Sequence, residues 1–327
     1  METRKDMKHL KTAVASAMLL LATLAHGQAY PNKPIKLIVP YSPGGAADLS
    51  ARWLAEGLTS QFKYQIVVEN HPGAAGNIGT RSVAAAKPDG YTLLLGYDGT
   101  LTINPSVYSN VGFDTLKDFV PVSKIADSTL LLVANNNLPA KDVKEMIAIA
   151  KAKPGTLDYA TTGVGSTPHA AGEMMNLQFG IDLRHIPYAG GAPAMTAVMG
   201  DHVKMVYTAV ATAYPFVVSG KVKALGVSAP KRSAALPNVP TFTEAGVPGF
   251  DLNSWFGILA PAGTPKQIVD QLQGAIKTVV ETPSYRDRYV AAGLEPVGNT
   301  SEQFTGQIRA DLTRWDAIVK KAKISAN

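Results

Sequence analysis

The chain has 327 residues, a formal net charge of +6 at pH 7 and no cysteine. The lack of cysteine excludes disulfides, thiolate metal sites, cysteine nucleophiles and a lipoprotein anchor. The mild basic excess contains no block of five like charges, so nothing indicates nucleic-acid binding, although the charge favours anionic small molecules.

The N-terminal segment has the pattern of a secretory signal peptide. Four basic residues fall within residues 1–11, and an apolar run from Ala13 to Ala25 follows them. This run is too short to anchor the protein in a bilayer, and small residues come after it. We predict a signal peptide over residues 1–29 with cleavage after Ala29, or alternatively after Gly27, and we expect the mature protein in the periplasm.

Strand and helix patterns then alternate along the chain. Several strands are short continuous apolar runs, which is typical of buried parallel strands, and the alternation predicts an α/β fold with a parallel sheet. The predicted strands are residues 35–41, 65–70, 91–97, 157–163, 203–210 and 223–230, and the predicted helices are residues 47–58, 80–87, 142–155, 166–180 and 192–200.

Two apolar segments, residues 128–134 and 254–260, are predicted to cross between two lobes. The first lobe would then comprise residues 30–128 and 254–327, and the second residues 129–253. Two α/β lobes joined by two crossings leave a cleft where a ligand can bind and a hinge can close. Trp255, in the second crossing, is expected to pack in the core or hinge rather than stack on a ligand.

An amphipathic helix is predicted over residues 264–281, and two further helical stretches follow it before the end of the chain. Thr264 is the predicted cap of this helix, with Pro265 at its first position.

A double glycine lies at the junction between the first strand and the first helix of the predicted fold. Ser42, Gly44 and Gly45 precede the helix, and Asp48 falls in its first turn. Glycines at a helix start let an anion approach the unpaired backbone amides, so this loop is a candidate anion site, with a plain tight turn as the alternative. The loop lacks the G-x-G-x-x-G pattern of dinucleotide-binding proteins and the lysine of a P-loop.

A second loop of the same kind occurs at residues 161–173. Thr167 is a predicted helix cap with Pro168 at the first helical position. Ser166, Thr167 and His169 would present hydroxyls, amides and an imidazole to the cleft. Two such loops, one from each lobe, predict that opposite ends of one anionic molecule are held between them.

Catalytic and metal sites find little support in the sequence. Ser166 and His169 could form a nucleophile and a base, but no G-x-S-x-G motif surrounds the serine. His169 and Glu173 are four residues apart, yet the second histidine of a zinc-binding helix is missing. We therefore expect no metal, no cofactor and no enzymatic activity, with an exported serine hydrolase acting through Ser166 as an unfavoured alternative.

Several longer motifs together resemble one family. They are "YPNKPIKLIVPYSPGGAADLSAR", "VVENHPGAAGNIGTRSVAAAKPDGYTLLLG", "TGVGSTPHAAGE", "IPYAGGAPAM", "PKRSAALPNVPTFTEAG" and "WFGILAPAGTP". The chain resembles, over its whole predicted mature length, the Bug family of extracytoplasmic solute-binding receptors of tripartite tricarboxylate transporters. The resemblance implies a two-lobed, type II-like Venus-flytrap fold that binds a small carboxylate and delivers it to membrane permease subunits. A monomer is expected, and a receptor that serves a membrane sensor kinase is the alternative.

In this family, ligand carboxylates are held by one loop from each lobe. The resemblance assigns this role to residues of both loops and, more weakly, to a tyrosine at the cleft edge: Tyr41, Ser42, Gly44, Gly45, Asp48, Thr162, Ser166, Thr167, His169 and Tyr188.

Three positions depart from the pattern common in relatives. Ala189 stands where many relatives have lysine, Lys204 where an acidic residue is common, and Thr208 where Asp or Asn often occurs. If Thr208 faces the cleft, the site lacks an acidic partner for a ligand ammonium group. We therefore predict a carboxylate without a free amine, either aliphatic di- or tricarboxylic or aromatic.

Overall fold

The structure is a computed structural model that describes residues 30–250 and 252–326. The predicted signal peptide, residues 1–29, lies outside the described residues. Residues 34–327 form one compact unit, and the description below concerns this unit alone. Among the described helices, none combines the length and the apolarity needed to cross a membrane.

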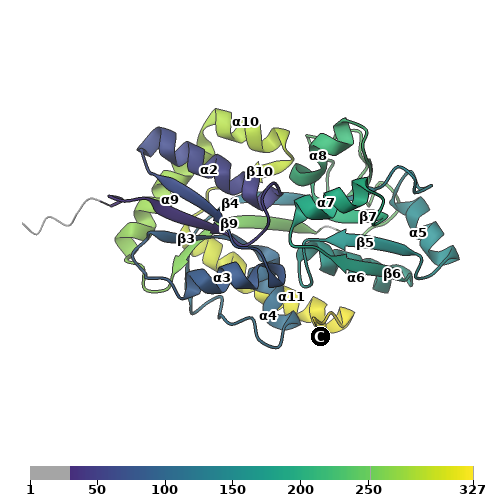
Figure 1. Cartoon of the computed structure of the whole chain (residues 1–327), viewed down its shortest axis with the longest axis horizontal. Coiled ribbons are helices and arrows are strands. Elements are labelled where there is room, and N and C mark those ends of the chain that lie inside the picture. The colour runs from purple at the N-terminus through teal and green to yellow at the C-terminus, as the bar shows by residue number, and fades with distance from the viewer. Residues whose placement is uncertain (1–29, 251, 327) are drawn as a thin grey trace, which may run out of the picture. The chain divides into compact units, whose positions relative to one another are not determined.

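The unit is an α/β structure with two lobes built on one continuous sheet (Figure 1). The sheet order is β2-β1-β3-β9-β4-β7-β5-β6, and β8 and β10 pair additionally with β4. The strands are β1 (Ile35–Val39), β2 (Ile66–Asn70), β3 (Thr92–Tyr97), β4 (Phe119–Ala134), β5 (Leu157–Thr161), β6 (Leu183–Pro187), β7 (Met205–Ala209), β8 (Lys223–Val227), β9 (Asn253–Pro261) and β10 (Leu294–Pro296).

The long strand β4 connects the two lobes. Its residues 119–129 pair with β9 in the first lobe, and its residues 130–134 pair with β7 in the second. The predicted crossings at 128–134 and 254–260 fall in these two strands. The predicted lobe ranges, 30–128 with 254–327 and 129–253, stay a prediction.

The prediction of a parallel sheet is correct only within each lobe. β1 pairs in parallel with β2 and β3, and β5 with β6 and β7. The crossing strands β4 and β9 are antiparallel to each other, β4 is also antiparallel to β7, β8 and β10, and β9 is also antiparallel to β3. The reason is that the chain enters the second lobe along β4 and returns along β9, so the two must run in opposite directions.

Helices cover the sheet in both lobes. They are α2 (Ala46–Phe62), α3 (Asn77–Ala84), α4 (Asn104–Val107), α5 (Val143–Ala152), α6 (Thr167–Phe179), α7 (Gly191–Met199), α8 (Val210–Val218), α9 (Lys266–Glu281), α10 (Pro283–Ala291) and α11 (Ser301–Ala322), with the short turns η1 (Ala74–Gly76) and η2 (Gly99–Ile103). Helix α8 was not predicted, because it continues directly from the apolar strand β7 and contains Pro215.

The predicted cap of α9 is wrong by one residue. Pro265 is the N-cap of α9, and the helix begins at Lys266. The Thr264 hydroxyl instead donates to the Pro261 carbonyl oxygen at 2.7 Å. Thr264 therefore closes the turn that leaves β9 instead of satisfying the first amides of the helix.

The last helix, α11, packs against both lobes. Phe304 and Ile308, in its first half, belong to a core cluster with Ile38 and Leu94 of the first lobe. Trp315, in its second half, belongs to a core cluster built largely from the second lobe. The helix thus joins the lobes, as β4 and β9 do, and its yellow ribbon runs beneath both of them in Figure 1.

Candidate ligand-binding site

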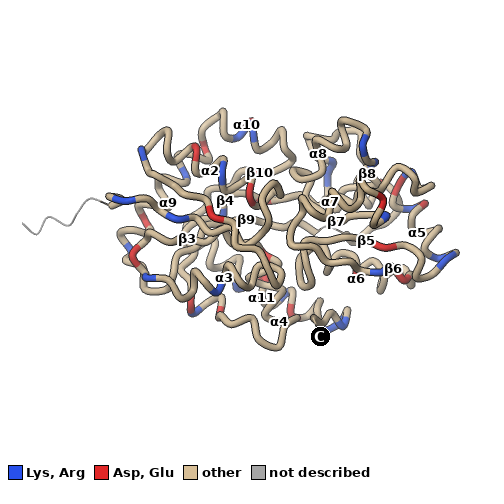
Figure 2. Tube along the Cα trace, viewed as in Figure 1, with Lys and Arg blue, Asp and Glu red and all other residues tan. Residues whose placement is uncertain are grey.

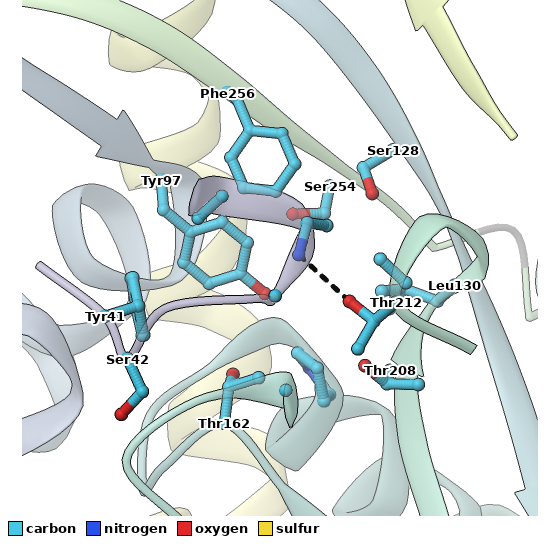
Figure 3. Close-up of a pocket in the computed structure, with 16 residues that line it drawn as sticks. Tyr41, Ser42, Tyr97, Ser128, Leu130, Thr162, Thr208, Thr212, Ser254 and Phe256 are labelled. Carbon is cyan, nitrogen blue, oxygen red and sulfur yellow. Dashed lines mark hydrogen bonds between the residues drawn. The ribbon is translucent and has the colours of Figure 1, made fainter. Parts of the chain in front are cut away.

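A pocket lies where the two lobes meet at the crossing strands (Figure 3). Its volume is about 40 Å³. A cavity of this size holds only a few water molecules, so the two sides of the cleft lie close together. The lining residues are Tyr41, Ser42, Gly45, Ala46, Ala47, Tyr97, Ser128, Leu130, Thr162, Pro168, Gly191, Thr208, Ala209, Thr212, Ser254 and Phe256.

The floor of the pocket is formed by alternate residues of neighbouring strands. Ser128 and Leu130 of β4 are two residues apart, as are Ser254 and Phe256 of β9, so each pair points to the same face of the sheet. Ser128 lies opposite Ser254 in the register. Tyr97 of β3 lies opposite Phe256, and their rings stack with centroids 5.6 Å apart. The floor therefore combines an aromatic part with two hydroxyls.

Ser128 has no internal partner for its hydroxyl. The residue is 1 % exposed, and its Oγ forms no hydrogen bond with any described residue. A buried hydroxyl without a partner is costly, and it is free to bond a polar group that enters the pocket.

The walls of the pocket are formed largely by helix N-termini. Residues of the first turns of α2, α6, α7 and α8 line the pocket, and α2, α7 and α8 lack a side-chain cap. A Cβ built on Gly45 of α2 would lie 3.6 Å from the amide nitrogen of Gly191 in α7, so these two helix starts face each other. Uncapped N-termini carry a partial positive charge that favours an anion, and their amides can bond it wherever no other group accepts from them, as Thr212 does from the Ala46 amide of α2.

None of the described residues that line the pocket is charged. Figure 2 shows basic and acidic residues interspersed over both lobes. No group of three or more His, Asp or Glu residues among the described residues is arranged to hold a metal ion. The site thus presents amides and hydroxyls to a ligand instead of a guanidinium, an ammonium or a cation.

The two glycines of the first loop serve different purposes. Gly44 has φ +84°, a conformation that other residues rarely adopt, whereas Gly45 has an ordinary φ of −84° and lines the pocket. Asp48 does not line the pocket: its carboxylate accepts hydrogen bonds from the Gly44 amide, Arg52 and Asn70. Burial alone would raise the pKa of Asp48, but these hydrogen bonds outweigh it and lower the pKa. Asp48 therefore holds the loop in shape from behind.

In the second loop, the structure corrects the predicted cap. Ser166, not Thr167, is the N-cap of α6, and its Oγ accepts from the His169 amide at 3.3 Å. Thr167 occupies the first helical position, and its hydroxyl donates to Asp98 of the first lobe at 2.8 Å. Ser166, Thr167 and His169 thus do not line the pocket, and they shape the loop that carries Thr162 into it.

His169 is packed inside the second lobe. Its Nδ1 accepts from the Gly165 amide at 3.1 Å, and its ring stacks on His185 with centroids 3.9 Å apart. Burial lowers the pKa of His169 to about 4, and burial together with His169 lowers the pKa of His185 to about 3. The Ser166 hydroxyl donates to the Gly163 carbonyl oxygen, so this loop lacks the serine–histidine hydrogen bond that a hydrolase requires.

Direct hydrogen bonds join the lobes around the pocket. The Ser42 amide and hydroxyl both donate to the Ala189 carbonyl oxygen, at 3.2 and 3.1 Å. The Ala46 amide, at the start of α2, donates to Thr212 Oγ1 in α8 at 3.0 Å, as the dashed line in Figure 3 shows. The lobes are therefore closed over the pocket.

Five of the sequence-predicted residues line the pocket: Tyr41, Ser42, Gly45, Thr162 and Thr208. Gly44, Asp48, Ser166, Thr167 and His169 lie behind it. Tyr188 packs beside a core cluster of the second lobe and does not line the pocket either.

Sequence reasoning missed the floor and the α8 wall. The missed residues of these two parts are Tyr97, Ser128, Leu130, Ala209, Thr212, Ser254 and Phe256, and the helix-start residues Ala46, Ala47, Pro168 and Gly191 were missed as well. The only available signal was the alternation of Ser128 with Leu130 and of Ser254 with Phe256 in segments already predicted to cross between the lobes.

Comparison with known proteins agrees with this architecture. Residues 50–324 match the model of the tripartite tricarboxylate transporter family receptor. The chain is 34 % identical to protein BugT of Bordetella pertussis over 302 residues, which cover 92 % of this chain and 93 % of that protein.

Solved structures of similar proteins share the fold. The periplasmic binding protein BugD is 34 % identical with a TM-score of 0.86, covering 90 % of this chain and 99 % of that one. An R. palustris protein solved with adipate is 32 % identical with a TM-score of 0.88, over 90 % and 99 % of the two chains. The protein MatC from Rhodopseudomonas palustris, solved with bound malate, is 30 % identical with a TM-score of 0.84, over 89 % and 100 %. The chain therefore belongs to the family of tripartite tricarboxylate transporter receptors, to which the Bug proteins also belong.

Proposed function

We propose that this protein is a periplasmic receptor that captures a small carboxylate between its lobes and delivers it to a tripartite tricarboxylate-type permease. The observation that carries the proposal is the composition of the pocket: several helix N-termini and hydroxyls converge there, and no lining residue is charged. This arrangement attracts an anion and leaves no unpaired buried cation when the ligand departs.

The expected affinity suits capture followed by release. A single helix N-terminus stabilises an anion by about 0.3–1 kcal/mol when exposed and by up to about 2 kcal/mol when partly buried. Several such contacts, together with hydroxyl hydrogen bonds, can reach about −8 kcal/mol, which corresponds to a Kd of about 1 μM. Because the lobes are closed over a pocket of about 40 Å³, the ligand must enter an open form.

Two relatives support a carboxylate as the ligand. Structures similar to this chain were solved with adipate and with malate. Membership of the receptor family supports delivery to a permease, and the predicted signal peptide supports export to the periplasm.

The test is a thermal-shift screen of the protein, expressed from the full-length chain and purified from the periplasm. The panel contains citrate, malate, succinate, adipate, aspartate, glutamate, nicotinate, benzoate and terephthalate. A ligand at 100 times its Kd should add about 2.7 kcal/mol of stability, which is readily measured. If no carboxylate shifts the transition, before or after unfolding and refolding to remove retained ligand, the proposal is wrong.

A matched pair of variants locates the binding site. Gly45→Val places methyl groups against the amides of α7 and should abolish the ligand-induced shift. Gly274→Val, in α9, has open space around its Cβ and should leave the shift intact. An undiminished shift in a folded Gly45→Val variant would place the ligand elsewhere.

A further inference from the structure

A buried carboxylate lies directly beneath the floor of the pocket. Asp98 follows the last residue of β3 and is 1 % exposed. One of its oxygens accepts from the Thr167 hydroxyl at 2.8 Å, and the other accepts from the Ser254 hydroxyl. Ser254 itself lines the pocket, as does Tyr97, the neighbour of Asp98 on β3. A ligand resting on the floor is thus separated from the carboxylate by a single serine side chain.

No positive charge compensates this carboxylate. Among the described residues, no Lys, Arg or His forms an ion pair or a hydrogen bond with Asp98, and its side-chain partners are the two hydroxyls. Burial is the main cause that raises its pKa to about 7, with Asp311 of α11 adding to the shift and the hydroxyl hydrogen bonds opposing it. A second negative charge placed on the floor would be repelled by the Asp98 carboxylate, with little screening of the repulsion.

The two ends of the pocket therefore differ. In Figure 3, Ser42 and Thr162 lie at one end, and Ser128, Ser254 and Phe256 lie at the other. The first end belongs to the two loops that bring amides toward a carboxylate. The second end offers the unpartnered Ser128 hydroxyl and the stacked rings of Tyr97 and Phe256, with Asp98 beneath.

We propose that the pocket takes a small carboxylate whose far end carries no second negative charge, and that Asp98 excludes a second carboxylate from the end formed by β4 and β9. This inference rests on the proposed function. It narrows the ligand class, because aliphatic dicarboxylates and tricarboxylates would place a charge on the floor.

Protonation of Asp98 should weaken the discrimination between monocarboxylates and dicarboxylates. The groups that face Asp98 are Tyr97 beside it, Tyr41 from the loop after β1, and Asp311 of α11. Burial raises the pKa of both tyrosines, so they stay neutral between pH 6.0 and 8.5. Over that range Asp98 passes from mostly neutral to mostly charged, and exclusion of a second carboxylate should strengthen as the pH rises.

The experiment measures Kd by calorimetry for two pairs of ligands that differ only at the far end. The pairs are pentanoate against glutarate and 4-methylbenzoate against terephthalate, and 5-aminopentanoate is the ammonium-ended analogue. In each pair for which binding is measured, the Kd of the monocarboxylate at pH 8.5 should be at least about 10-fold lower than the Kd of the dicarboxylate. This ratio corresponds to about 1.4 kcal/mol. At pH 6.0 the ratio should be smaller. A dicarboxylate that binds as tightly as its monocarboxylate at pH 8.5, or 5-aminopentanoate disfavoured as strongly as glutarate, would overturn the inference.

Two variants assign the effect to Asp98. Asp98→Asn keeps the shape and removes the charge, so the ratio should fall below about 3-fold and lose its pH dependence. Asp127→Asn is the control, because Asp127 adjoins Ser128 on β4 but points to the opposite face and pairs with Lys124. It should retain the wild-type ratio. An unchanged ratio in Asp98→Asn would contradict the role of Asp98, and binding of no carboxylate at all would instead refute the proposed function.

Discussion

Ser128 carries a hydroxyl that has no hydrogen-bond partner among the described residues. Its hydroxyl is buried, unpartnered and on the pocket floor. Ser128→Ala should change the free energy of unfolding by less than about 0.5 kcal/mol, because no internal hydrogen bond is lost. Ligand affinity should fall about 5- to 10-fold, the value of one hydrogen bond.

Ser50→Ala provides the comparison for this variant. Ser50, in α2, also has a buried unpartnered Oγ but does not line the pocket. Chemical denaturation and calorimetry on both variants should show equal stability and a loss of affinity in Ser128→Ala only. Equal affinities would mean that the ligand does not reach the floor.

Because the pKa of Asp98 is raised in the folded protein, its contribution to the free energy of unfolding decreases as the pH rises. Its pKa is about 7 in the folded protein and about 3.8 in the unfolded chain. The folded state therefore binds the proton more tightly, and the stability that this adds is present below pH 4 and lost as the pH rises to about 7. Three pKa units correspond to about 4 kcal/mol.

Comparison with Asp98→Asn isolates this contribution. His169 and His185 have lowered pKa values, so their contributions change with pH in the opposite direction, but these contributions are the same in both proteins. The stability of the wild type relative to Asp98→Asn should therefore fall between pH 4 and 7, as measured by urea unfolding. A pH-independent difference would show that Asp98 is not protonated in the folded state.

At the scale of elements, the two adjacent glycines that precede α2 have different conformational requirements. Gly44 requires a positive φ, whereas Gly45 has an ordinary φ and a Cβ position without close contacts. Gly44→Ala should destabilise the protein by about 1–2 kcal/mol, the cost of the left-handed conformation. Gly45→Ala should be neutral in stability. Thermal unfolding of the two variants tests this difference, and equal melting temperatures would contradict it.

In the second loop, Ser166, Thr167 and His169 fix the shape of the loop, although none of them lines the pocket. Ser166 caps α6, His169 accepts from Gly165, and Thr167 bonds Asp98. These bonds fix the backbone that presents Thr162 to the pocket. The sequence identified the loop correctly, because strand, glycines and helix start are local patterns. The direction of each side chain depends on contacts that local patterns do not contain.

At the scale of the whole molecule, three elements join the lobes: β4, β9 and α11. Trp315 of α11 is 1 % exposed and packs in a core cluster largely of the second lobe, while Phe304 of the same helix packs in the first. Trp315→Ala should lower the free energy of unfolding by about 3–5 kcal/mol.

Because the shared elements couple the two cores, the wild type and Trp315→Ala should each unfold in a single calorimetric transition. A variant that unfolds in two separated transitions would show that the lobes are independent. Scanning calorimetry of both proteins, with Leu177→Ala at an exposed position as the control, distinguishes the two cases.

The sequence by itself determined the family, the α/β alternation, the two crossings and the two glycine loops. The family followed from the resemblance of six longer motifs, whereas the other features depend on patterns within a few tens of residues, such as strand periodicity, helix starts and glycine placement. Of the five predicted site residues that line the pocket, Tyr41, Ser42, Gly45 and Thr162 lie in the loops after β1 and β5, whereas Thr208 lies within β7.

Only the tertiary structure decided the floor of the pocket and the burial of Asp98. Ser128 lies opposite Ser254 because β4 and β9 pair in a particular register, although 126 positions separate them in the chain. Asp98 reads in the sequence as a polar residue after a strand, and it becomes an uncompensated charge beneath the pocket only when Thr167 and Ser254 enclose it. Register and burial arise from contacts between distant segments, and those contacts fix what the far end of the pocket accepts.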